Sequence, residues 1–206
     1  MFKIRYIFCF LLLISAISYA QKSTQQTINV SDIEEIRIHT NKIFQLNIYS
    51  VDTNMLKIET QMEGEYYRDV NVITATKNNK LQLSCELAED FVLPNDKLSA
   101  HKVFAITMHL YIPKKLNVQL EGDETQVYIE GSYKKLWAVL ISGNFNLNQL
   151  NAEAIIQTKK GNIHYNKQPL PRFETASDQQ IIFYQNGKKV ELKADNGKIT
   201  YSANKE

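Results

Sequence analysis

The sequence predicts an all-β protein built as a parallel β-helix, or β-solenoid, regular in its C-terminal half and irregular in its N-terminal half. Three observations predict this fold. Apolar and polar residues alternate along most of the chain. The segment KKGNIHY at 159–165 is similar to the segment DNGKITY at 195–201. Equivalent apolar positions recur with an 18-residue period. A repeat this short cannot bury its own apolar face, so successive copies must stack.

The first predicted element is an export signal at residues 1–20. Lys3 and Arg5 precede an apolar run that ends in Ser18-Tyr19-Ala20, which is the pattern of a secretory signal peptide. The run is shorter than the roughly 17 to 20 residues of a permanent membrane span, and no other segment is long enough. We therefore expect an exported protein that is periplasmic, on the cell surface or extracellular, with a mature chain that begins near Gln21.

The remaining chain is predicted to form a flexible leader at 21–29 and a single domain at 30–206. Within this domain, residues 30–112 contain alternating runs of uneven length between polar turns, which predict irregular N-terminal coils. Residues 86–102 are expected to be an excursion that includes a helical turn.

Residues 113–206 are predicted to form regular 18-residue rungs. Steps of this length from Gly161 reach Gly143 and Gly197, with Thr125 and Gln179 at the other two anchor positions. A glycine at the anchor lets the chain turn between two short strands. The side chains two positions after each anchor are expected to form one buried column: Val127, Phe145, Ile163, Ile181 and Ile199.

The fourth copy breaks this pattern. Arg172 and Glu174 fall on inward positions, where unpaired charges would be costly. The prolines at 169 and 171 cannot donate ladder hydrogen bonds. A one-residue slip that turns Phe173 inward is therefore expected there.

Cysteine usage and charge exclude several classes of protein. Without its signal the chain keeps one cysteine, Cys85, which follows an alternating leucine pattern and is predicted to be a buried, inert thiol. Removal of Lys3 and Arg5 leaves 22 basic residues against 22 acidic ones, so no basic field would attract nucleic acid. Lysines in the last repeat are expected to protect the final strand edge, which favours a monomer.

The segment from Leu110 to Tyr165 resembles a known group of proteins. Its strand ending in Ile112-Pro113, followed by alternating blocks with a central glycine, resembles the secreted adhesin-like β-strand-repeat families of unknown function in Gram-negative bacteria. These include the head GIN domain of proposed autotransporter adhesins. The resemblance implies a right-handed parallel β-helix, export, and a role in adhesion or envelope interactions, without catalytic residues to carry over.

Two outward columns are the candidate contact surfaces. One contains amides beside the anchors, among them Asn144 and Asn162, and the other brings Trp137 beside Ile155. Either could bind a glycan or an envelope or surface protein. Amide ladders more often solvate turns, and a loop or the N-terminal half is expected to cover the Trp137 column.

The function predicted from these features is a non-enzymatic, adhesin-like binding or structural module of the cell envelope. No metal site or cofactor is predicted, because the four histidines are scattered and no phosphate-binding loop is present. The alternative is a carbohydrate-active enzyme, of the polysaccharide lyase or hydrolase type, whose acid would come from Glu121, Asp123 or Glu124.

Overall fold

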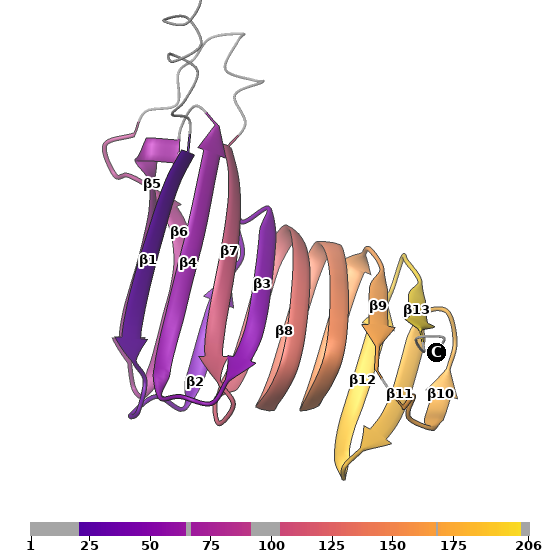
Figure 1. The fold of residues 1–206 in the computed structure, drawn as a ribbon. Coiled ribbons are helices and arrows are strands. Elements are labelled where there is room, and N and C mark those ends of the chain that lie inside the picture. Colours follow the sequence, from indigo (N-terminus) through magenta and orange to yellow (C-terminus); the bar gives the residue numbers. More distant parts are fainter. Residues whose placement is uncertain (1–20, 65–66, 92–103, 168, 203–206) are drawn as a thin grey trace, which may run out of the picture.

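The computed structural model of this chain describes residues 21–64, 67–91, 104–167 and 169–202 (Figure 1). The predicted signal peptide and most of the predicted excursion lie outside these residues. The described part consists of β-strands and one short 3-10 helix, η1 (Tyr67–Asp69), so the all-β prediction is confirmed. Among these residues no helix has the length and apolar character needed to cross a bilayer.

The strands form one curled sheet. In chain order they are β1 (Gln21–Asn29), β2 (Glu35–His39), β3 (Gln45–Val51), β4 (Met55–Gly64), β5 (Val70–Lys77), β6 (Lys80–Leu87), β7 (Phe104–Pro113), β8 (Asn117–Lys160), β9 (Ile163–Asn166), β10 (Phe173–Ala176), β11 (Gln180–Gln185), β12 (Lys188–Ala194) and β13 (Ile199–Ser202).

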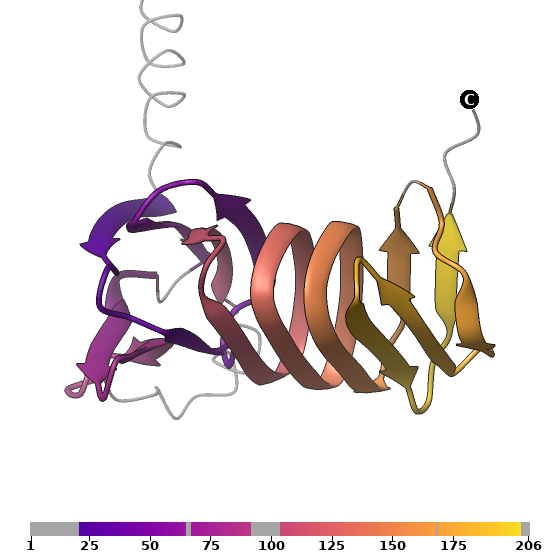
Figure 2. The same cartoon turned by 90° about the horizontal axis from the view of Figure 1, so that it is seen from below.

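β8 winds about the long axis of the molecule and takes part in both flanks of the curled sheet (Figures 1 and 2). The first flank is defined as the part of the sheet where β8 pairs in parallel with β2 and β12. The second flank is the part where β8 pairs in parallel with β3 and β9. The first flank continues through β6 on one side and through β11 and β10 on the other. The second flank continues through β7, β4 and β1, and through β13.

Parallel register aligns like residues from distant segments. Met108, Leu46 and Val127 are successive neighbours on the second flank, and Phe145, Ile163 and Ile199 continue the same arrangement. Inward side chains of both flanks meet in a continuous core and alternate with outward ones, as the period of a strand requires. Removal of this apolar surface from water is the main stabilising contribution.

All five residues of the predicted buried column are buried, but one of them, Ile181, does not lie on the same flank as the other four. Val127, Phe145, Ile163 and Ile199 belong to the second flank and are at most 5% exposed. Ile181 is equally buried, yet it lies in β11 and is paired with Leu192 of the first flank. Ile163 and Ile199 are direct neighbours, without a residue of the fourth copy between them.

The fourth copy is thus not a rung, which corrects the prediction of regular rungs throughout 113–206. β10, β11 and β12 form an antiparallel meander, and Val190 of β12 pairs with Ala154. Prolines before β10 lack the amide donors that a central strand needs. Glu174 is exposed, and Phe173 is half-buried against Phe183, with ring centroids 5.7 Å apart.

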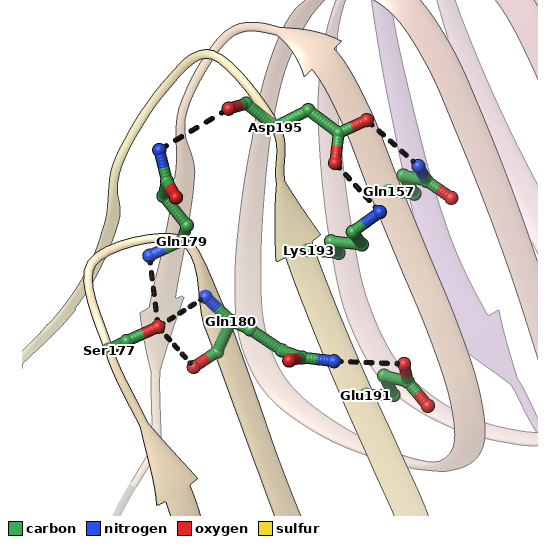
Figure 3. Close-up of polar contacts among 7 residues, drawn as sticks. All are labelled: Gln157, Ser177, Gln179, Gln180, Glu191, Lys193 and Asp195. Atoms are coloured by element: carbon green, nitrogen blue, oxygen red, sulfur yellow. Dashed lines mark hydrogen bonds and ion pairs between the residues drawn. The ribbon is translucent and has the colours of Figure 1, made fainter.

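The turn before β11 explains why Gln179 replaces an anchor glycine. Ser177 Oγ accepts hydrogen bonds from the backbone amides of Gln179 and Gln180, at 3.4 Å and 2.9 Å (Figure 3). The Gln179 side-chain amide donates to the carbonyl of Asp195 at 3.3 Å, and Gln157 donates to the Asp195 carboxylate at 3.1 Å. Side chains therefore stabilise this turn, and it is Gly197, two repeats after Gly161, whose backbone makes the close approach to the Gly161 carbonyl.

Two further expectations are wrong. Residues 21–29 are not a flexible leader but strand β1, which pairs antiparallel with β4 along its whole length. Backbone hydrogen bonds suffice for this pairing although most of its side chains are polar, and Ile28 packs against the core. Of the five C-terminal lysines expected to protect a free edge, Lys188, Lys189 and Lys193 lie on β12, which β11 covers, so these three do not protect one. Lys198 directly precedes β13, which among the described strands pairs with β9 alone, and Lys205 lies outside the described residues.

Glycines allow close packing at one corner of the curled sheet. A Cβ added to Gly161 would lie 1.8 Å from the carbonyl oxygen of Gly143, and one added to Gly197 would lie 1.7 Å from that of Gly161. Non-bonded atoms do not approach so closely, so no larger residue fits without movement of the backbone. A second corner has positive φ at Gly131 (105°) and Gln149 (48°), which are also separated by one repeat.

The Cys85 thiol is predicted to be unreactive in the folded protein. Its side chain is buried, as the sequence indicated, and burial raises the pKa of this thiol to about 12. The thiolate is the reactive form, so in a chain that begins at Gln21 and lacks Cys9 we expect labelling by a disulfide reagent at pH 8 to be at least about 100-fold slower than after unfolding in urea. Equal rates before and after unfolding would contradict this burial.

Candidate functional site

Asn144 and Asn162 lie together on the second flank, in a row of outward amides. Asn144 Nδ2 donates to Gln126 Oε1 at 2.9 Å, and Asn144 Oδ1 accepts from the Asn162 backbone amide at 2.7 Å. Asn162 Oδ1 accepts in turn from the Lys198 backbone amide at 2.9 Å. These amides stabilise the corner, and they also form one wall of a groove.

The groove has a volume of about 420 Å³ and crosses β3, β8 and β9. The described residues that line it include no Asp, Glu, Lys or Arg. His164 is held by hydrogen bonds with Thr200 Oγ1 and Ser202 Oγ at 2.9 Å and 3.3 Å. The outward polar residues of the lining are Gln45, Asn47, Gln126, Tyr128, Asn144, Asn146, Asn162 and His164.

Asn47 is the most buried polar residue of this groove, at 5% exposure. The register of β3 places it between His109 of β7 and Tyr128 of β8. Its Oδ1 accepts from Gln45 Nε2 at 3.1 Å, whereas its Nδ2 has no hydrogen-bond partner in the structure. This Nδ2 atom is closed to solvent, and a buried amide donor without an acceptor costs about 1–3 kcal/mol.

An aromatic cluster borders the groove. The ring centroid of Tyr49 lies 5.5 Å from that of Tyr111 and 5.8 Å from that of Tyr128. The His109 ring is nearly parallel to that of Tyr49, with an interplanar angle of 7°. Lys57 Nζ lies 5.3 Å from the Tyr111 ring centroid. The four rings form a half-buried aromatic surface beside the amides.

Carboxylates hold the hydroxyl ends of two of these tyrosines, Tyr128 and Tyr111. The Tyr128 hydroxyl donates to Glu130 Oε2, and Asn148 Nδ2 donates to the same oxygen at 2.9 Å. These two hydrogen bonds lower the pKa of Glu130, while burial and the bond to Glu130 raise the pKa of Tyr128 to about 12. The Tyr111 hydroxyl similarly donates to Glu59 at 3.3 Å.

Acid is expected to remove the contribution of Glu130 to stability. Because its pKa in the folded state lies below the ordinary 4.5, its contribution is present above pH 4.5 and is lost as the pH falls through the folded value. Glu130→Gln should therefore lower the free energy of unfolding at pH 7 by about 1 kcal/mol and by less at pH 3. Urea unfolding at both pH values measures this.

Glu153→Gln provides the matched control for Glu130. Glu153 forms an ion pair with Lys135 at 3.2 Å, and both side chains are more than half exposed. Such pairs contribute little, so we expect this variant to match the wild type at both pH values. An equal loss in the two variants, or a Glu130→Gln loss that grows in acid, would contradict the assignment.

The first flank exposes the other predicted column. Trp137 is 38% exposed and Ile155 48%, and Ile141 is 49% exposed nearby in β8. The expectation that a loop or the N-terminal half covers this column is therefore wrong for the part of the chain that is described. We call Trp137, Ile141 and Ile155 the Trp137 strip; it lies on the opposite flank from Asn144 and Asn162, and the two sets do not form one site.

The acidic residues of the alternative enzyme hypothesis do not converge with a catalytic partner set. Glu121 Oε1 lies 3.1 Å from His39 Nδ1, and the two side chains are 47% and 40% exposed. Asp123 and Glu124 are exposed beyond Gly122, and none of the three acids lines the groove. No group of three or more His, Cys, Asp or Glu residues is arranged to hold a metal ion within the residues described.

Sequence reasoning missed Asn47 and the tyrosine cluster. Gln45 of β3 pairs with Gln126 of β8, but their separation along the chain is not a whole number of repeats. The outward alternation of Asn47 and Tyr49 was visible in the sequence. Only the register of β3 against β8 and β7 reveals which residues they meet.

Comparisons with known proteins bear on the fold. No protein-family model and no curated protein matches the chain. The structure resembles that of a candidate cell adhesion protein from Clostridium sporogenes, with a TM-score of 0.54 and 13% identity over 88% of this chain and 98% of that one. Candidate adhesins from Parabacteroides distasonis (TM-score 0.34, 18% identity, 70% and 69% covered) and Bacteroides fragilis (0.35, 12%, 88% and 97%) align less closely. At this identity the likeness to the Clostridium protein is one of fold.

Proposed function

We propose that this chain is an exported, non-enzymatic, adhesin-like binding module of the cell envelope. Residues 1–20 would be its export signal, and the rest a single monomeric domain. The Clostridium structure, whose fold is similar, is that of a candidate cell adhesion protein, which supports this assignment. The secreted adhesin-like families that the sequence resembles give the same expectation.

The proposed scaffold is a right-handed parallel β-helix with 18-residue rungs, interrupted by the β10–β11 hairpin. Its support is the separation of neighbouring residues along the chain. Phe145 pairs in parallel with Ile163, and Asn148 donates to Glu130, each pair being separated by one repeat. Ile163 pairs with Ile199 at twice this distance. Such a scaffold presents like side chains in rows, which suits repeated contacts with an extended partner.

The groove on the second flank is the observation that carries the proposal. It offers amide donors and acceptors from β3, from β8 and from Asn162 just before β9 on a fixed framework, without an arrangement of acid and base. Sites that bind without reaction need oriented polar groups and a preformed surface. Asn144 and Asn162 belong to this site, and Trp137 and Ile155 form a second contact surface for an envelope or surface protein.

Binding to whole cells and to isolated envelope fractions tests the proposal. The chain from Gln21 onward, labelled with a fluorophore, should bind saturably. Asn146→Arg, which places a charged side chain in the groove at an exposed position, should reduce binding at least about tenfold. Trp137→Ala combined with Ile155→Ser tests the strip in the same assay.

Lys77→Ala serves as the control, since Lys77 is exposed in the β5–β6 hairpin, away from both surfaces. It should bind as the wild type does. Absence of saturable binding by the wild type would contradict the proposal. Turnover of a polysaccharide that is lost in Asp123→Ala would favour the enzyme alternative instead.

A further inference from the structure

We propose that the outer edge of β1 binds an extended, proline-free segment of an envelope or surface protein by β-strand addition, through hydrogen bonds between backbone groups. This inference rests on the proposed function, because its partner is the protein that the binding module is proposed to contact. Three features support it: the outward backbone groups of β1, the regular length of this strand, and its contrast with the other terminal strands of the sheet.

The first feature is the direction of the backbone groups. β1 is the outermost strand at the N-terminal end of the second flank (Figure 1), and among the described strands it pairs with β4 alone. The amide of Val30 donates to the carbonyl of Asn54 at 3.0 Å, and residues of an antiparallel strand alternate between its two edges. The even-numbered residues of β1 therefore face β4, and Ser23, Gln25 and Thr27 direct their amides and carbonyls outward.

The second feature is the length and regularity of this edge. The register between β1 and β4 runs without a shift over all nine residues, from Gln21 to Asn29, and the strand contains no proline or glycine. Its one charged side chain, Lys22, crosses to β5 and donates to the carbonyl of Val70 at 3.2 Å. Edge strands that avoid pairing are usually short, bulged, interrupted by proline or covered, and β1 shows none of these features within the described part of the chain.

The third feature is the contrast with the other strands that pair on one side only, which are β5, β10 and β13. In β5 the carbonyl of Val70, which faces away from β6, accepts the hydrogen bond of Lys22. In β13 the amide of Ile199, which faces away from β9, donates to the carbonyl of Asp178 at 2.6 Å. β10 has only four residues, and its register with β11 is interrupted. The edge of β1 is the one that remains long and regular among these four.

The chemistry of β1 describes the partner. Strand addition needs an extended segment with backbone amides at the paired positions, which excludes proline there. The side chains of β1 are polar except that of Ile28, which is half-buried against the core. An apolar side chain of the partner beside Ile28 would cover it. Backbone hydrogen bonds would supply most of the affinity, and this one apolar position would supply selectivity.

Binding to isolated envelope fractions tests the inference, with the chain from Gln21 onward labelled with a fluorophore. Gln25→Pro removes an outward amide and places a ring on the edge, while Thr24 and Gln26 keep their hydrogen bonds to β4. It should weaken binding at least about tenfold. Urea unfolding shows that the variant is folded. Should it fail to fold, Thr27→Pro removes the neighbouring outward amide and should have the same effect on binding.

Two control variants separate the backbone of β1 from other causes. Gln25→Ala removes the side chain but keeps the amide, so it should bind as the wild type does. Thr76→Pro makes the proline substitution at an exposed position of β5, on the edge that faces away from β6. It should also leave binding unchanged.

Amide hydrogen exchange of the free protein, followed by NMR, tests the edge without a partner. The amides of Gln26 and Ile28 should exchange at least about 100-fold more slowly than those of Gln25 and Thr27, because only the former are bonded to β4. Equal protection of Gln25 and Gln26 would show that the edge is covered within the chain, and the inference would be wrong.

The binding results distinguish this inference from the proposed function. If the wild type binds envelope fractions and the folded Gln25→Pro variant binds equally well, the inference fails while the proposed function stands. An equal loss in Thr76→Pro would also overturn it. A wild type that dimerises in sedimentation, with a monomeric Gln25→Pro variant, would show that the edge takes a second copy and not an envelope protein. If the wild type binds no envelope fraction, both proposals fail.

Discussion

Replacing Gly161 with alanine is expected to lower the free energy of unfolding by about 3 kcal/mol or more. The added Cβ would lie 1.8 Å from the carbonyl oxygen of Gly143 and 2.7 Å from its carbonyl carbon. These are backbone atoms, which cannot move aside as the end of a flexible side chain can. The φ of Gly161, 159°, is also one that L-residues rarely adopt. Urea unfolding followed by circular dichroism gives the change.

Gly187→Ala separates the two causes of this loss. Gly187 has a φ of 74° in the turn between β11 and β12, but an added Cβ there would meet no atom within 4 Å. Gly187→Ala should therefore lower the free energy of unfolding by about 1 kcal/mol, which is the cost of a positive φ for an L-residue without any steric clash. If Gly161→Ala cost no more than Gly187→Ala, neighbouring turns would not pack as closely as described.

Ile163→Asp should be as harmful, with an expected loss of about 4 kcal/mol or failure to fold. Ile163 is fully buried between Phe145 and Ile199 on the second flank. A carboxylate there would be surrounded by apolar side chains without a partner. The measurement is again the free energy of unfolding, with the fraction of soluble protein recorded for each variant.

Asn162→Asp is the control for this substitution, because it places the same carboxylate one residue earlier on an outward position. Asn162 Oδ1 accepts the hydrogen bond of the Lys198 amide, and an aspartate oxygen can accept it equally well. This variant should stay within about 0.5 kcal/mol of the wild type. Equal losses in the two variants would show that the inward and outward assignments are wrong.

Much of the core could be predicted from alternation and from the anchor glycines. The 18-residue step identified Val127, Phe145, Ile163 and Ile199 as buried neighbours of one flank. It could not place Ile181, because alternation has the same period of two in parallel and antiparallel strands. Strand β1 was missed for a related reason: its pairing depends on backbone hydrogen bonds, which leave no apolar pattern in the sequence.

The candidate site was only partly predictable. The repeat placed Asn144 and Asn162 beside one another correctly, since both follow anchor glycines. Asn47 joins them through the register between β3 and β8, which connects segments outside the repeat. Nothing in the sequence indicated that Trp137 would remain open at 38% exposure, because coverage of a sheet face depends on where distant segments pack.

The central claim is that segments one repeat apart lie side by side in parallel, and disulfide formation between introduced cysteines tests it most directly. Asn146 and His164 are register partners with outward side chains, and neighbouring strands are about 4.8 Å apart, within disulfide reach. In a Cys85→Ser chain, Asn146→Cys with His164→Cys should form an intramolecular disulfide on mild oxidation. Asn146→Cys with Gln157→Cys, on opposite flanks, should not. A first pair that stays reduced, or a second that oxidises as readily, would contradict the account.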